Sequence, residues 1–159
     1  MVLRYIKLGM VGSIALFFSL IAIDNLIEFA SNLPAVQHVL SMDTTFHVPI
    51  LMQRAIINPS IQIGIYYLII AWEFLTAIVC WIGCVRLLFN INASDSQFIA
   101  AKTVAFIGLF LGFILYMVGF IIIGGEWFSM WQSPSWNAQP TAGLFVSLIM
   151  FVMIFLALP

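Results

Sequence analysis

The sequence of 159 residues is 64% hydrophobic and 7% charged, and its formal net charge is −1. Soluble domains have roughly a quarter of their residues charged, and disordered chains combine low hydrophobicity with high charge, so the composition excludes both classes. The near balance of basic and acidic residues also excludes a basic nucleic-acid-binding protein. The composition therefore indicates an integral membrane protein whose partners include the lipid bilayer and no nucleic acid.

Four apolar segments follow one another along the chain. A membrane-spanning helix needs about 20 apolar residues, and each segment approaches or exceeds that length. Polar and apolar residues do not alternate in these segments, which excludes transmembrane β-strands. We therefore predict an all-α membrane protein, folded as a four-helix bundle in a single transmembrane domain over residues 1–159. The expected helices cover about residues 5–28, 59–89, 97–123 and 141–158, and the expected outer cap covers 29–58 and 124–140.

The basic residues predict the orientation of the bundle. Arg4 and Lys7 precede most of the first helix, and Arg86 and Lys102 flank the short loop between the second and third helices. Only Arg54 falls on the other side. Since basic residues concentrate on the cytoplasmic side of membrane proteins, we predict that both termini are cytoplasmic. The outer face is then acidic, because Arg54 faces four carboxylates there: Asp24, Glu28, Asp43 and Glu126.

Small residues recur on one face of the third expected helix, at spacings of three, four and seven. Such a stripe allows two helix backbones to approach closely inside a membrane. We favour packing within the chain, and a second copy or another membrane protein stays open as the alternative. The stripe consists of Ala101, Ala105, Gly108, Gly112 and Gly119.

The first outer segment, residues 29–58, carries signals for two short helices. Ser31 or Asn32 is a suitable N-cap for a helix over 34–42 that starts at a proline. A second short helix is expected over 49–57. Asn58 followed by a proline then predicts the start of the second spanning helix. Ser94 followed by Gln97 resembles a capping box and predicts the start of the third.

The second outer segment contains three tryptophans within ten residues, directly after the third expected helix. One interpretation is an aromatic belt at the membrane interface. The other is a surface that stacks against a ligand. Gly124 and Gly125 are expected to break the helix here. The residues that we consider for contact with a lipid or a protein partner are Trp127, Met130, Trp131, Trp136 and Asn137.

Glu73 is the ionisable residue that lies deepest in an expected span. It follows Ile61 by twelve residues, which at ~1.5 Å per residue places it about 18 Å into the helix, near the middle of the bilayer. A charge there is costly, so we expect a protonated or hydrogen-bonded carboxyl group. A structural carboxyl and a proton relay or ligand site both remain open. The candidate partners are a backbone carbonyl or one of four hydroxyls: Ser19, Tyr66, Tyr67 and Tyr116.

Arg54 is expected to join the acidic residues of the outer face in a buried network that ties the two outer segments together. The alternative is an arginine that grips an anionic substrate or a lipid headgroup. The residues that we consider for ligand or proton binding are Glu73, Asp24, Asn25, Asp43, Arg54 and Glu126.

Histidine and methionine lie close together in the first outer segment. His38 and Met42 are four residues apart on an expected helix, and His47 follows. Imidazole and thioether groups suit copper, and a pair of histidines can hold haem. A single pair without further ligands is weak evidence for either. We therefore predict no cofactor and expect hydrogen-bonded histidines that support the cap.

Several strings in the outer segments resemble those of the bacterial "predicted small integral membrane protein" family, a domain of unknown function. The resemblance covers nearly the whole chain and implies a four-helix protein of the bacterial inner membrane, without an assigned activity or catalytic residues. It rests on Asn25, Ser31-Asn32, the string QHVLSMDT from Gln37 to Thr44, Arg54, Glu73, the string GEWFSMWQ from Gly125 to Gln132, and Trp136-Asn137.

An enzyme that acts on a lipid or a quinone is our third hypothesis, but no nucleophile–base pair, metal triad or cofactor motif in the sequence supports it. We therefore expect a non-enzymatic accessory or assembly subunit that engages a protein partner or lipid through its tryptophan-rich outer cap. The alternative is a small binding or transport protein for a proton, a cation or a small polar ligand. That function would use Glu73 together with the acidic residues and Arg54 of the outer face.

Overall fold

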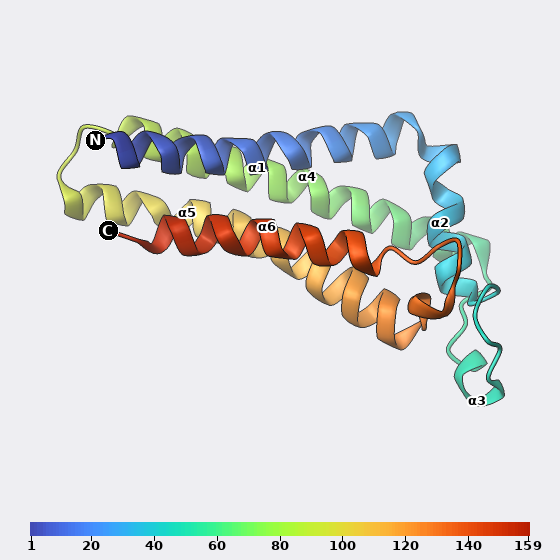
Figure 1. The fold of residues 1–159 in the computed structure, drawn as a ribbon. Coiled ribbons are helices and arrows are strands. Elements are labelled where there is room, and N and C mark those ends of the chain that lie inside the picture. Colours follow the sequence, from blue (N-terminus) through green and yellow to red (C-terminus); the bar gives the residue numbers. More distant parts are fainter.

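The computed structural model describes all 159 residues, which form helices and connecting loops without any strand. Four long helices run side by side (Figure 1). Each is long and apolar enough to cross a membrane. This architecture confirms the predicted all-α membrane helix bundle. The four spans are α1 (Val2–Ile27), α4 (Pro59–Phe89), α5 (Asp95–Ile114) with its continuation η1 (Leu115–Trp127), and α6 (Gln139–Ala157).

The bundle has two unlike ends. Both termini and the short loop between α4 and α5 lie at one end, which we call the termini end (Figure 1). The other end, which we call the cap end, carries α2 (Phe29–Ser41), α3 (Pro49–Met52) and η2 (Met130–Gln132). Figure 1 shows α2 running across the bundle, whereas the four long helices run along it.

Two predicted helix starts are confirmed by their hydrogen bonds. The side chain of Asn58 accepts bonds from the backbone N–H groups of Ser60 and Ile61, and a proline occupies the first position of α4. Ser94 and Gln97 form a reciprocal capping box at the start of α5. Both devices satisfy N–H groups that have no partner within the helix.

The first outer segment differs from its prediction. α2 begins at Phe29, one residue after the break at Glu28, so Ser31 and Asn32 lie inside the helix and cap nothing. Pro34 is also inside α2, as its sixth residue, where it has no N–H group to donate to the helix. The second short helix ends at Met52 and does not reach residue 57.

The third span changes its winding in its second half. η1 is a π-helix of 13 residues. It includes Gly124 and Gly125, at which we expected the helix to end. The break comes later, at Ser129, whose φ of 54° is left-handed. π-helical segments are rare and usually a single turn long, and they often occur at functional sites. The sequence gives no warning, because an α-helix and a π-helix draw on the same apolar residues.

The small-residue stripe packs inside the bundle, as we favoured from the sequence, except at Gly119, where no other helix lies within 4 Å of an added Cβ atom. A Cβ atom on Gly83 of α4 would lie 2.6 Å from the Cα of Ala105, and one on Gly108 would lie 2.6 Å from the Sγ of Cys80. A Cβ on Gly112 would lie 2.7 Å from the ring of Phe18 in α1. These approaches place the stripe against α4 and α1, where only glycine allows such a short distance between helices.

Candidate functional site

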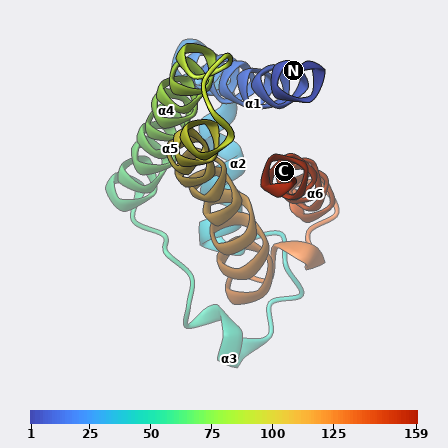
Figure 2. The same ribbon diagram turned by 90° about the vertical axis from the view of Figure 1, so that its left-hand side faces the viewer.

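An apolar groove lies between α4 and η1 at the cap end, with α2 on one side. Its volume is about 350 Å³, and 17 of its 19 lining residues are hydrophobic. Figure 2, seen together with Figure 1, shows α4 and the α5–η1 helix separating toward the cap end. Leu68, Val118 and Ile123 line the groove and are exposed, Leu68 by 63%, so the groove opens sideways from the bundle.

The side chain of Trp72 explains why α4 and the α5–η1 helix separate. Its indole Nε1 donates a hydrogen bond of 3.0 Å to the carbonyl of Leu111, so the ring stands between α4 and α5. Trp72 also lines the groove. Gly119 lines the other wall, and a Cβ there would meet only the Cδ1 of Leu115 at 3.8 Å, which leaves room beside it.

Both outer segments close the groove at the cap end. Leu40 of α2 and Phe128 line it and form a small buried cluster with Met42. Ala55 and Ile56 pack against that cluster. From the second outer segment, Met130, Trp136 and Ala138 also line the groove. The cap is therefore built from two segments that lie far apart in the sequence.

Three hydrogen bonds join these two segments. The Thr44 Oγ1 donates to the Oγ of Ser133 at 2.8 Å, and the backbone N–H of Phe46 donates to the Gln132 Oε1 at 2.9 Å. Arg54 Nη1 donates to the carbonyl oxygen of Trp127 at 3.2 Å. These bonds fix the position of one segment relative to the other.

Arg54 does not make the predicted contact with a carboxylate. Its guanidinium carbon lies 4.5 Å from the centroid of the Trp127 ring, a cation–π geometry, in addition to the bond to the Trp127 carbonyl. The two ion pairs of the structure are Arg4–Asp95 and His38–Asp43. The prediction was wrong because the number of charges in a segment does not show which of them lie close together in the fold.

The other carboxylates of the cap end are engaged elsewhere or exposed. Asp43 accepts a bond of 2.8 Å from His38, and Glu126 accepts one of 3.2 Å from Gln139. Asp24 and Glu28 are exposed at the end of α1. The acidic residues of the cap end therefore do not gather into one site.

The candidate metal ligands do not converge either. The His38 ring faces Asp43 and stacks on Trp136, with ring centroids 4.7 Å apart and an interplanar angle of 14°. Met42 is buried in the apolar cluster with Leu40 and Phe128, and the ring of His47 bonds to the backbone carbonyl of Asp43. No group of three or more His, Cys, Asp or Glu side chains is close enough to hold a metal ion. The geometry gives the copper and haem hypotheses no support.

The remaining contact candidates have separate roles. Trp127 and Trp131 are both about half exposed, but the left-handed turn at Ser129 prevents them from sharing a helix face. The ring of Trp131 lies edge-on to Phe46. Asn137 precedes the N-cap residue of α6, and its side chain accepts a bond from the first N–H group of that helix, on Gln139.

Glu73 is enclosed, with 2% of its surface exposed. Its partner is Asn25, whose Nδ2 lies 3.1 Å from Oε1 and 2.9 Å from Oε2 and donates to this carboxyl group. The Asn25 Oδ1 in turn accepts from Asn32 at 3.2 Å and from the Tyr66 hydroxyl at 3.1 Å. Glu73 is hydrogen-bonded, as expected, but its partner is neither a hydroxyl group nor a backbone carbonyl.

We considered Asn25 for ligand binding but did not predict its hydrogen bond to Glu73. The pairing depends on the register between α1 and α4, which periodicity within either helix does not give. Asn25 lies in the last turn of α1, so Glu73 sits at the level where α1 ends, while α4 continues past it to Pro59.

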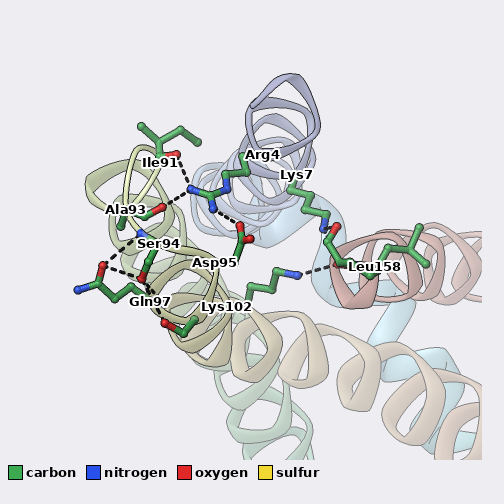
Figure 3. Close-up of polar contacts among 11 residues, drawn as sticks. Arg4, Lys7, Ile91, Ala93, Ser94, Asp95, Gln97, Lys102 and Leu158 are labelled. Carbon is green, nitrogen blue, oxygen red and sulfur yellow. Dashed lines mark hydrogen bonds and ion pairs between the residues drawn. The ribbon is translucent and has the colours of Figure 1, made fainter.

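The termini end is closed by basic side chains (Figure 3). Lys7 and Lys102 are 1% and 4% exposed, and both donate to the carbonyl oxygen of Leu158, after the end of α6. Lys7 also donates to the carbonyl of Pro159 at 2.8 Å. Arg4 donates to the carbonyls of Ile91 and Ala93 and, at 2.6 Å, to Asp95. From the sequence we used these basic residues only to predict the orientation in the membrane. We did not predict that they donate hydrogen bonds to backbone carbonyls.

Comparison with protein-family models identifies the chain. The model described as "Predicted small integral membrane protein (DUF2165)" matches residues 3–159, nearly the whole sequence. The chain therefore belongs to this family, and it is an integral membrane protein that spans the bilayer several times and contacts its lipids. A comparison with curated proteins and one with solved structures each found no match.

Proposed function

We propose that this protein is a non-enzymatic accessory or assembly subunit that binds a membrane lipid at its cap end. The hydrocarbon chain of the lipid lies in the groove between α4 and η1. The observation that carries the proposal is that groove, which is apolar, partly roofed by the cap and open sideways.

The groove suits a hydrocarbon chain in size, chemistry and access. Its volume of about 350 Å³ lies within the range of small-molecule sites, which is roughly 300–1,000 Å³. Its lining offers contact surface and almost no hydrogen-bonding groups, so a polar ligand would lose its hydration there without compensation. The sideways opening faces the bilayer, where lipid chains are abundant.

Filling the groove tests this proposal. Gly119→Leu places a branched side chain in the open space of the groove wall. Gly64→Leu is the matched control, because Gly64 is exposed on α4 and an added Cβ meets no atom within 4 Å. Both proteins are reconstituted in vesicles that contain a phosphatidylcholine with a photoactivatable acyl chain. After illumination, mass spectrometry locates the labelled peptides.

We expect the wild type and Gly64→Leu to be labelled on the half-buried α2 residues Val36 and Val39, which line the groove. Gly119→Leu should lose this labelling and keep the labelling of α6, which lies outside the groove. Equal labelling of α2 in all three proteins would show that no chain enters the groove, and the proposal would then be abandoned.

The second candidate function is proton or cation binding at Glu73. It is favoured by one observation, namely that the enclosed carboxyl group has no basic partner and bonds only to Asn25. A buried carboxyl group without a base is a common element of proton pathways in membranes. Against it, neither of the two main cavities reaches Glu73.

A flux measurement tests the second candidate. Proteoliposomes that contain a pH-sensitive dye and the wild-type protein should dissipate an imposed proton or cation gradient faster than empty vesicles, and Glu73→Gln should abolish the difference. Equal rates for wild-type and empty vesicles would remove this candidate.

For the orientation, we propose a bacterial inner membrane with the termini end in the cytoplasm. The proposal is supported by the four bases near the termini end, Arg4, Lys7, Arg86 and Lys102, against Arg54 at the cap end. Reporters fused after Leu88 should read cytoplasmic, and a reporter fused near Ser133 should read periplasmic. A cytoplasmic signal from Ser133 would reverse the assignment.

A further inference from the structure

Arg54 is the one lysine or arginine at the cap end, and its guanidinium group is paired with no carboxylate. Two contacts with a single residue hold it in place, the bond to the Trp127 carbonyl and the stacking over the Trp127 ring. Only one of its N–H groups makes a hydrogen bond in the structure. The side chain is therefore oriented, charged and still able to donate to a further acceptor.

The position of Arg54 relates it directly to the groove. Ala55 and Ile56 follow it in the chain and pack on Leu40 and Phe128, both of which line the groove. The backbone N–H of Ile56 donates to the Leu40 carbonyl at 2.8 Å, which fixes this segment on the end of α2. Trp127 directly precedes Phe128. Arg54 thus lies at the cap-end rim of the groove, next to the residues that close it.

The nearby charged groups do not neutralise Arg54. Asp43 is paired with His38, and Glu126 is bonded to Gln139. His47 bonds to a backbone carbonyl and brings no negative charge. An anion that reached the rim of the groove would find a guanidinium group without a counter-ion.

We propose that Arg54 binds the phosphate of an anionic phospholipid whose acyl chain occupies the groove. This inference rests on the proposed function, and it names the class of lipid. A guanidinium group matches the geometry of a phosphate, to which it can donate two parallel hydrogen bonds. Trp127 and Trp131 are also exposed at the cap end. Exposed tryptophans are typical of the depth at which lipid headgroups lie. The charged group and the apolar groove thus match the two parts of one lipid.

The experiment compares two lipids that share their acyl chains and differ in charge. Phosphatidylglycerol and diacylglycerol are offered in equal amounts to the purified protein in detergent, and native mass spectrometry measures the bound fraction of each. The wild type should prefer phosphatidylglycerol. Arg54→Gln, which keeps a donor for the Trp127 carbonyl, should lower phosphatidylglycerol binding about tenfold and leave diacylglycerol binding unchanged, because a charge-assisted bond is lost. Arg54→Lys keeps the charge and should retain most of the preference.

The variants separate a failure of this inference from a failure of the proposed function. If Gly119→Leu lowers the binding of both lipids while Arg54→Gln leaves the preference intact, the groove proposal stands and the role of Arg54 is overturned. A wild type that shows no preference overturns it equally. If Gly119→Leu leaves both lipids bound, the proposed function itself fails. Thermal unfolding of each variant confirms that folded proteins are compared, and Arg54→Met, which also removes the charge, replaces Arg54→Gln if that variant does not fold.

Discussion

The two ends of the bundle differ in how closely the same two helices, α4 and the α5–η1 helix, pack against each other. At the termini end, α4 and α5 approach so closely that a Cβ on Gly83 would overlap the backbone of Ala105. Long basic side chains then tie the neighbouring loop and the end of α6 to the bundle (Figure 3). At the cap end the same pair of helices separates, and the space between them remains as an apolar groove.

Side-chain size along one helix pair accounts for the difference. Glycine and alanine at the contact bring the backbones together, whereas the indole of Trp72 stands between α4 and α5 and bonds to the Leu111 carbonyl. In a membrane, packing and hydrogen bonds determine how closely helices associate, because lipid chains are as apolar as the side chains. A closed end therefore stabilises the bundle, while a wedge at the other end leaves space for a ligand.

Breaking the closed end should produce the largest effect. Gly83→Val forces a branched side chain against the backbone of Ala105, which cannot move aside. Overpacking costs about 1–3 kcal/mol and occasionally more, and we expect this variant at the upper end because the contact is with backbone atoms. We expect a strong loss of thermal stability in detergent, whereas Gly64→Val, on the open surface of α4, should change little. Similar melting temperatures for the two variants would contradict the close approach of α4 and α5.

The next largest effect is expected at the junction between the spans and the cap. Asn25 bonds to Glu73, Asn32 and Tyr66, so Asn25→Leu leaves the carboxyl group and the Asn32 amide without a partner. An unsatisfied buried polar group costs about 1–3 kcal/mol, and Tyr66 keeps the Asn25 backbone carbonyl as an acceptor. We expect a loss of about 3 kcal/mol in the free energy of unfolding, and faster hydrogen exchange in α2. If α2 exchanges as in the wild type, this network does not position the cap.

The architecture was predictable from the sequence because its signals are local. Apolar length gave the four spans, Asn58 and Ser94 gave two helix starts, and the small-residue stripe gave the packing of the third span. These features depend on residues that are neighbours in the chain or on one helix.

The candidate site was less predictable because it depends on register and winding. Asn25 meets Glu73 only through the alignment of two antiparallel helices, and Arg54 meets Trp127 only after both outer segments have folded. Six of the residues that line the groove lie in η1, and the sequence carries no signal for the π winding of that segment. The charges along the sequence predicted an arginine–carboxylate network, but Asp43 and Glu126 bond to other residues, and Asp24 and Glu28 are exposed.

Substitutions in the Arg4–Asp95 ion pair at the termini end should have smaller effects, and the effect should differ between the two residues. The Arg4 side chain is 14% exposed and bonds to two backbone carbonyls in addition to Asp95, whereas the Asp95 side chain is 95% exposed. Arg4→Gln should lower the free energy of unfolding by about 1–2 kcal/mol, because carbonyls of the α4–α5 loop lose their donor. Asp95→Asn should have little effect, since exposed ion pairs contribute little. Equal effects in chemical unfolding would show that the ion pair itself matters, and the backbone bonds do not.

The smallest effect is expected for Glu73→Gln. Glutamine has the shape of glutamate and keeps a carbonyl oxygen that can accept from Asn25, so the bond between α1 and α4 persists. We expect a change of less than about 1 kcal/mol in the free energy of unfolding. Glu73→Leu is the matched variant, because it leaves the Asn25 amide without an acceptor and should cost about 1–3 kcal/mol. Glu73→Leu should be the more damaging of the two variants if the Glu73 carboxyl group acts only as a hydrogen-bond acceptor between α1 and α4. If Glu73→Gln is as damaging as Glu73→Leu, the carboxyl group is needed for its charge or its proton, and the case for a site that binds a proton or cation becomes the stronger one.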